Sequence, residues 1–178
     1  MIAGAHAVIW VRQDAPGTDA CRFADAEGGY LIDGSSTDAT GHFLPYRIRA
    51  RGDGTTRRAR IGATSRIFLR RAPDDTWMLN GAPAPAVTGA KDIDFGFTPA
   101  TFTLPIRRLK LGVGDEAEIM VARLDLEKER LTPLHLVFRR TANTEYECLN
   151  AETGKTSHLS VDAQGIVQTH TGHWIAQT

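Results

Sequence analysis

The chain has 178 residues, of which 42% are apolar and 24% charged, proportions typical of a soluble globular protein with one domain. Its formal net charge is zero and its sequence pI is about 7.0. This balance argues against a general nucleic-acid binder, which usually carries a net positive charge.

Alternation of apolar and polar residues dominates the chain and predicts β-strands. In 45–52, for example, apolar residues alternate with Arg47, Arg49 and Arg51. In chain order, the predicted strands are 7–12, 45–52, 57–62, 65–71, 76–81, 117–126, 134–140, 144–149 and 157–170. Asn80-Gly81 and residues 163–165 are predicted hairpin turns. The one helix candidate, 124–131, is short and uncapped, so strand competes with helix there.

About ten to twelve short strands, separated by frequent turn signals, indicate an all-β protein. We expect a mainly antiparallel sandwich, barrel or roll that forms a single domain over residues 1–178. The two cysteines, Cys21 and Cys148, predict neither a disulfide framework nor a zinc motif. His6 and Arg12 interrupt the N-terminal apolar run. We therefore expect a cytoplasmic protein without a signal peptide or membrane insertion.

Arginine is concentrated in one part of the chain. Residues 42–71 contain nine arginines and a single acid, Asp53, whereas residues 115–152 contain nine acids and five basic residues. One interpretation is that the arginines pair with the acidic half across strands. Another is that they form a patch for an anionic or sugar-phosphate headgroup. Nucleic acid is a third interpretation, weakened by the net neutrality and by the few aromatic residues available for stacking.

Residues 91–109, KDIDFGFTPATFTLPIRRL, combine acids, hydroxyls and arginines. Asp92 and Asp94 lie two apart on a strand and so point to one face, where carboxylates attract hydroxyl donors or arginines. Pro99 and Pro105 predict an irregular extended segment rather than a paired strand. Either Arg107 or Arg108 is expected to reach inward and pair with an aspartate; the sequence does not decide which.

This set of acceptors and donors is suited to binding a polyol, but a buried network that fixes the chain would use the same residues. Neither a phosphate loop nor a parallel β/α pattern supports a divalent ion at the two aspartates. Three histidines, His158, His170 and His173, are more often solvated or hydrogen-bonded than zinc ligands. We predict no metal, no cofactor and no catalytic residues, since no nucleophile stands with a base.

The block KDIDFGFTPATFTLPIRRLKL resembles the glycolipid-binding protein family, a bacterial group with a spiral β-roll fold. Asp92, Asp94, the TP and T-x-T positions and LPIRRL match the family pattern one by one. Trp10, Tyr46, Arg60 and residues 161–167 give weaker matches, as does Trp77 with Gly81. Phe102 departs from the asparagine usual in the family and removes a polar group. The resemblance implies a β-roll and a glycolipid ligand.

The resulting hypothesis is non-catalytic binding of a glycolipid or other amphipathic small molecule in a β-roll or open-barrel cavity. The predicted ligand-binding residues are Asp92, Asp94, Thr98, Thr101, Thr103, Arg107, Arg108, Arg47 and Trp77. One alternative is a hydrolase or other enzyme that acts on a sugar or lipid through Asp92 or Asp94. Another is a structural or interaction module that forms a homodimer through a sheet edge.

Overall fold

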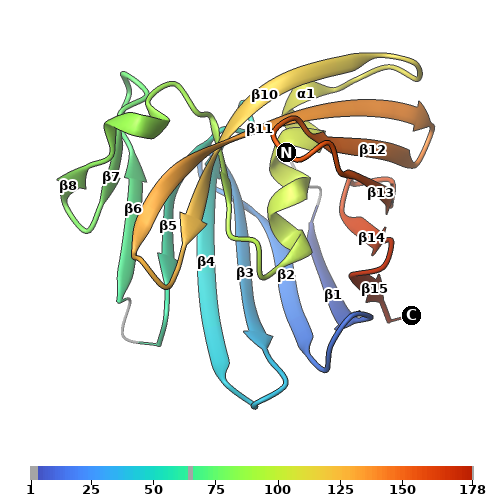
Figure 1. Cartoon of the computed structure of the whole chain (residues 1–178), viewed down its shortest axis with the longest axis horizontal. Coiled ribbons are helices and arrows are strands. Elements are labelled where there is room, and N and C mark those ends of the chain that lie inside the picture. Colours follow the sequence, from blue (N-terminus) through green and yellow to red (C-terminus); the bar gives the residue numbers. More distant parts are fainter. Residues whose placement is uncertain (1–3, 64–65, 178) are drawn as a thin grey trace.

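The computed structural model describes residues 4–63 and 66–177, which are mostly β-strand (Figure 1). The strands are β1 (Ala5–Arg12), β2 (Thr18–Ala26), β3 (Gly29–Thr37), β4 (Phe43–Arg51), β5 (Thr56–Ile61), β6 (Ile67–Arg71), β7 (Trp77–Leu79), β8 (Ala82–Pro83), β9 (Asp92–Asp94), β10 (Glu116–Asp125), β11 (Arg130–Ala142), β12 (Glu145–Asn150), β13 (Thr156–Val161), β14 (Val167–His170) and β15 (Trp174–Ala176). The helical segments are η1 (Pro85–Val87), η2 (Pro99–Phe102) and α1 (Thr103–Leu109).

All these strands belong to one sheet, in the order β8-β7-β6-β5-β4-β3-β2-β1-β15-β14-β13-β12-β11-β10-β9. Neighbouring strands are antiparallel except β9, which lies parallel to β10. The first and last strands meet in the middle of the sheet, where Trp10 pairs with Ala176. The two outermost strands, β8 and β9, follow one another in the chain, so the connection that carries η1 spans the gap between the sheet edges.

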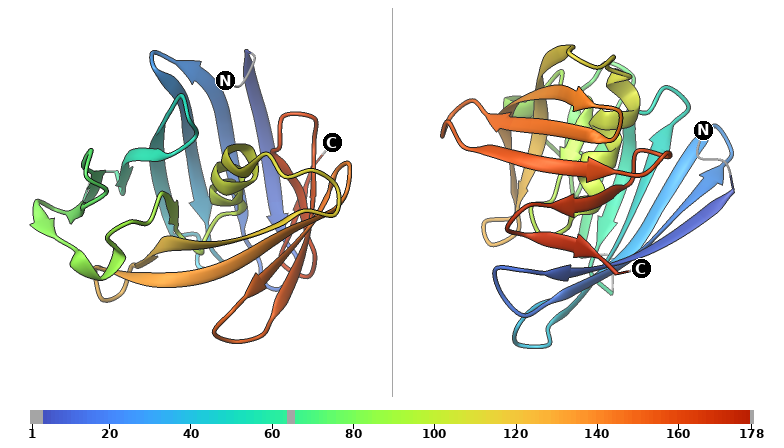
Figure 2. Two further views of the ribbon diagram at one scale, coloured as in Figure 1. Left: turned by 90° about the horizontal axis from the view of Figure 1, so that it is seen from above. Right: turned by 90° about the vertical axis from the view of Figure 1, so that its right-hand side faces the viewer.

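The sheet curls around α1, which lies inside the concave face between β1–β5 and β10–β14 (Figure 2). One core cluster lines the β1–β7 side and includes the fully buried Trp10, Phe23 and Trp77. A second cluster joins α1 to β10–β14 through Ile106 and Phe138. The helix therefore fills part of the roll and leaves the remaining interior available for cavities.

The gap between the sheet edges, here called the seam, is bridged by hydrogen bonds. Trp77 Nε1 donates to the Ala90 carbonyl at 2.8 Å, and the Thr56 amide donates to the Lys91 carbonyl at 2.9 Å. Trp77 is fully buried at this point. It holds the η1 connection against the sheet.

The predicted all-β, mainly antiparallel roll is confirmed, and its sheet is not closed. Strands occur at each predicted position, and the turns at Asn80-Gly81 and 163–165 connect antiparallel neighbours. The strand predicted at 65–71 begins at Ile67, and Ser65 lies outside the described residues. The predicted ranges leave out β2, β3 and the short strands β8 and β15, although β2 and β3 place apolar side chains at alternate buried positions.

One local prediction was wrong, and one choice that the sequence left open is decided in favour of strand. The segment after Thr98 is helical rather than extended, because Pro99 starts η2 and Pro105 lies in the first turn of α1. Proline is tolerated there, since the first amides of a helix have no intrahelical acceptor. The helix candidate 124–131 is a hairpin: Asp125 pairs with Arg130 across a tight turn. None of the described helices is long and apolar enough to cross a membrane.

Candidate functional site

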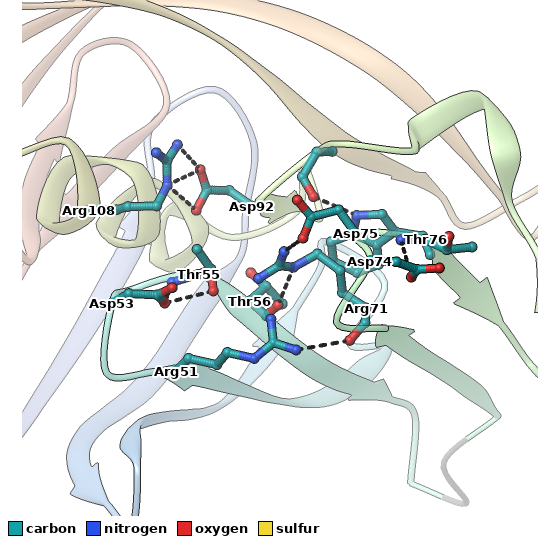
Figure 3. A network of polar contacts seen from close by, with 12 residues as sticks. Arg51, Asp53, Thr55, Thr56, Arg71, Asp74, Asp75, Thr76, Asp92 and Arg108 are labelled. Carbon is teal, nitrogen blue, oxygen red and sulfur yellow. Dashed lines mark hydrogen bonds and ion pairs between the residues drawn. The ribbon is translucent and has the colours of Figure 1, made fainter.

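The segment 92–109 contributes a buried ion pair between Asp92 on β9 and Arg108 on α1 (Figure 3). Arg108 Nη2 and Nε donate to Asp92 Oδ2 at 2.6 and 3.0 Å. The Asp92 side chain is 1% exposed and that of Arg108 is 16% exposed. Burial raises the pKa of Asp92, and the Arg108 guanidinium opposes that rise. The pair fixes α1 to the edge strand β9.

A second polar network lies beside this pair at the ends of β4 to β6 (Figure 3). Arg71 is buried, donates from Nε to the Thr56 carbonyl at 2.8 Å and forms an ion pair with Asp75. Arg51 Nη2 donates to the Arg71 carbonyl at 3.4 Å. These bonds satisfy main-chain carbonyls where the strands end, so the network is architectural.

Asp94 differs from Asp92 because it lines a cavity. It accepts hydrogen bonds from Thr101 Oγ1 at 3.2 Å and from the Gly96 amide at 3.0 Å. It also forms an ion pair with Arg123, whose side chain is 42% exposed. Gly96 has φ +71°, and a Cβ there would lie 2.6 Å from Arg123 Cζ. Glycine thus lets the guanidinium lie directly over the backbone.

A buried carboxyl, Asp19 on β2, lies behind this site. Tyr46 donates from its hydroxyl to the two Asp19 oxygens, at 2.9 and 3.1 Å, and shares a 3.0 Å hydrogen bond with Thr98 Oγ1. Among the described residues, no cation forms an ion pair with Asp19. Burial raises the pKa of Asp19 to about 7, and the hydrogen bonds from Thr98 and Tyr46 only partly offset it.

A cavity of about 380 Å³, here called the polar cavity, opens in front of Asp94. Its apolar wall includes Phe102, Leu134, Leu136, Cys148 and Trp174, and its polar wall includes Arg12, Asp94, Thr98, Arg123, Asn150, Lys155, His170 and His173. The His170 ring packs edge-on against Phe102, with centroids 5.2 Å apart. Burial and then His173 lower the pKa of His170 to about 4, so this imidazole is neutral at pH 7.

A larger cavity of about 600 Å³, here called the apolar cavity, opens between the β3–β4, β5–β6 and β10–β11 connections. Its apolar lining includes Phe43, Leu44, Ile61, Ile67, Phe97 and Leu126. Charged side chains also line this cavity. Two of them, Arg66 and Glu129, form an ion pair at 2.6 Å. Arg12 lines both cavities. Phe97 lines the apolar cavity, and Gly96 and Thr98 on either side of it line the polar cavity, so the two cavities are neighbours.

Residues 7–175 match the model of a family described as "Putative glycolipid-binding". The chain belongs to this family. A solved structure, the crystal structure of a DUF1089 family protein from Pseudomonas aeruginosa, is similar with a TM-score of 0.67. The two share 26% sequence identity over 96% of this chain and 90% of that chain. A search of curated proteins found no match.

In this family member, the predicted site residues occupy different places. Asp94 and Thr98 line the polar cavity, and Thr101 hydrogen-bonds to Asp94. Asp92 and Arg108 form the buried pair behind them. Asp92 and Asp94 do share one face, and each bonds to an arginine as the pattern predicts.

The structure does not bring the other predicted residues to the cavity. Arg108, rather than Arg107, pairs with an aspartate; Arg107 donates to the Gln164 carbonyl and covers the Tyr30 ring. Thr103 is fully buried, and its hydroxyl has no hydrogen-bond partner in the described part of the chain. Arg47 lies on the outer face in an ion pair with Asp33, and Trp77 lies at the seam.

Sequence reasoning missed Arg123 and Asp19. Arg123 pairs in register with Asp94 across the parallel strands β9 and β10, a long-range register that local patterning does not reveal. Asp19 did leave a signal: in TDACRFADA it shares the inward period with Cys21 and Phe23. A carboxyl at an inward position is unusual and marks a buried polar network.

No group of three or more potential metal ligands gathers within residues 4–63 and 66–177. His158 lies 3.8 Å from Glu147, and His173 lies 3.2 Å from Asp14. The three histidines are thus held by different partners: His170 by Phe102 and His173, the others by carboxylates.

Proposed function

We propose that this protein binds an amphipathic molecule of the glycolipid class, without chemical change, in the hollow of its roll. The observation that carries the proposal is the pair of neighbouring cavities with contrasting linings that share Arg12. Small-molecule sites combine a mostly apolar wall with a few placed polar groups, in volumes of roughly 300–1,000 Å³. The apolar cavity suits an acyl chain, and the polar cavity suits a headgroup.

The chemistry of the polar cavity supports a hydroxyl-rich headgroup. Asp94 supplies a carboxylate acceptor that Thr101 and the Gly96 amide hold in place. Arg123 is partly exposed and supplies hydrogen-bond donors. Asn150 supplies both a hydrogen-bond donor and an acceptor. Trp174 offers an apolar face. Sugar hydroxyls need acceptors and donors at fixed positions, which this set provides. The description of the family points to the same ligand class.

The geometry favours binding over catalysis. Asp92 and Asp94, the carboxylates that an acid–base mechanism would use, are each held by an arginine. Asp92 is also too deeply buried to meet a ligand. A general acid needs a proton to transfer at the site, whereas a charge-paired carboxylate serves to orient a partner.

Native mass spectrometry of protein purified gently from its host, followed by lipid extraction, tests this proposal. We expect a discrete adduct of glycolipid mass in the wild type and its loss in Asp94→Asn and Arg123→Gln. Asp33→Asn is the matched control, because Asp33 forms an ion pair with Arg47 on the outer face. It should keep the adduct. A wild type that stays free of adduct after incubation with host lipid extract would contradict the proposal.

A further inference from the structure

The outer face of β4–β6 carries six arginines, here called the arginine face. They are Arg47, Arg49, Arg57, Arg58, Arg60 and Arg70. The alternate residues of the same strands, such as Ile48 and Ala59, are buried in the core. The arginine face therefore lies on the opposite side of the sheet from the hollow of the roll.

The register sets these arginines directly opposite one another. Arg47 pairs with Arg60, and Arg58 pairs with both Arg49 and Arg70. Like charges directly opposite on neighbouring strands destabilise a sheet. Burial lowers the pKa of Arg58, and the positive charges of Arg49, Arg57 and Arg60 lower it further. A folded protein gains nothing from this arrangement by itself.

The acids needed to neutralise this charge are nearly absent. Within the described chain, Arg47 is the one member of the arginine face that forms an ion pair, with Asp33 at 2.6 Å. The acidic second half does not compensate either, since its one ion pair with the arginine-rich run among the described residues joins Glu129 to Arg66. A hollow of about 90 Å³ lies among Arg47, Arg49, Arg58 and Arg60.

We propose that the arginine face docks the protein on a membrane surface rich in anionic phospholipid, with lipid phosphates held between the arginines. Guanidinium groups bind phosphate oxygens bidentately, and a cluster of them on a sheet face matches a layer of phosphates. Single-stranded nucleic acid fits less well, because it needs aromatic platforms for stacking. Phe68 is the aromatic residue in register with Arg60, and the Arg60 guanidinium covers its ring at 5.5 Å.

Vesicle flotation with the full chain tests this proposal. The probes are phosphatidylcholine vesicles with and without about 30% phosphatidylglycerol, at low and at roughly 0.5 M salt, where charge interactions are screened. The variant is Arg49→Gln/Arg58→Gln/Arg60→Gln. Its matched control, Lys110→Gln/Lys128→Gln/Arg139→Gln, removes the same charge from exposed residues elsewhere. Each arginine near an anionic surface contributes about a factor of five, so the loss of three arginines should weaken binding on the order of 100-fold.

We expect the wild type and the control to bind anionic vesicles but not neutral ones, and to be released at high salt. The variant should lose binding to the anionic vesicles. Because the substitutions relieve repulsion, the variant should unfold at a temperature no lower than the wild type. Equal binding by variant and wild type would overturn the proposal. So would equal flotation with neutral vesicles, or tighter binding of wild type to a 20-nucleotide single strand than to anionic vesicles. These outcomes do not depend on a ligand in the hollow.

Discussion

Asp19→Asn is the substitution whose effect can be worked out most directly from the structure. The Asp19 carboxyl is fully buried and receives its hydrogen bonds from the hydroxyl of Tyr46, which also contacts Thr98. Burial raises its pKa from 3.8 to about 7. The folded protein therefore holds a proton on this group more tightly than the unfolded chain does, and ionising Asp19 costs stability.

The magnitude follows from the size of the pKa shift. A shift of about three pKa units, at 1.36 kcal/mol per unit, corresponds to about 4 kcal/mol. Because the folded-state pKa is the higher one, the contribution of Asp19 to stability is fully present below about pH 4 and is lost as the pH rises to about 7. Asparagine is neutral at every pH and keeps an acceptor for Tyr46, so Asp19→Asn removes this dependence.

Urea unfolding of the wild type and Asp19→Asn at several pH values from 4 to 8 measures the effect. We expect the stability of the wild type, relative to Asp19→Asn, to fall by about 4 kcal/mol between pH 4 and pH 8. Taking the difference between the two proteins cancels the titration of all other groups. A difference that stays constant within about 1 kcal/mol over this range would refute the assigned burial and its consequence for the pKa.

Three further substitutions test the architecture around the site. Arg108→Met leaves Asp92 buried without a partner, so thermal unfolding should show that the free energy of unfolding falls by about 3–5 kcal/mol. Adding Asp92→Asn to the same chain should restore part of this stability, and no recovery would contradict the pairing. Gly96→Ala should displace Arg123, which should lower the free energy of unfolding by about 1 kcal/mol or more and weaken ligand binding. Unchanged binding would show that Arg123 does not take part in the site. Trp77→Phe loses the hydrogen bond across the seam, so the backbone amides of residues 84–91 should exchange hydrogen faster than in the wild type. Protection equal to the wild type would show that the seam does not need the indole.

The sequence predicted the fold, and two of the predicted site residues, Asp94 and Thr98, line the polar cavity. Alternating strands such as β4 leave a local pattern, and the pairing of Asp92 and Asp94 with arginines follows from their shared face. The α1 helix escaped prediction because prolines at 99 and 105 usually indicate extended chain. Here both lie where a helix start accepts them.

The missing part of the site depends on long-range register. Arg123 reaches Asp94 because β9 pairs in parallel with β10. Arg47 lies on the outer face because neighbouring residues of a strand point to opposite faces, and its neighbour Tyr46 is buried. Trp77 is predicted to bind the ligand, yet its indole completes a seam that only the curled sheet creates. Such contacts follow from the topology rather than from any local motif.

The most direct test of ligand binding in the roll is an NMR titration of the isotope-labelled protein with n-octyl-β-D-glucoside below its critical micelle concentration. We predict saturable shifts of amide signals that cluster at residues 94–98, 123, 134–136 and 170–174, and that weaken strongly in Asp94→Asn but not in Asp33→Asn. Shifts confined to the outer face of the sheet, or shifts that do not saturate, would contradict a glycolipid site in the hollow.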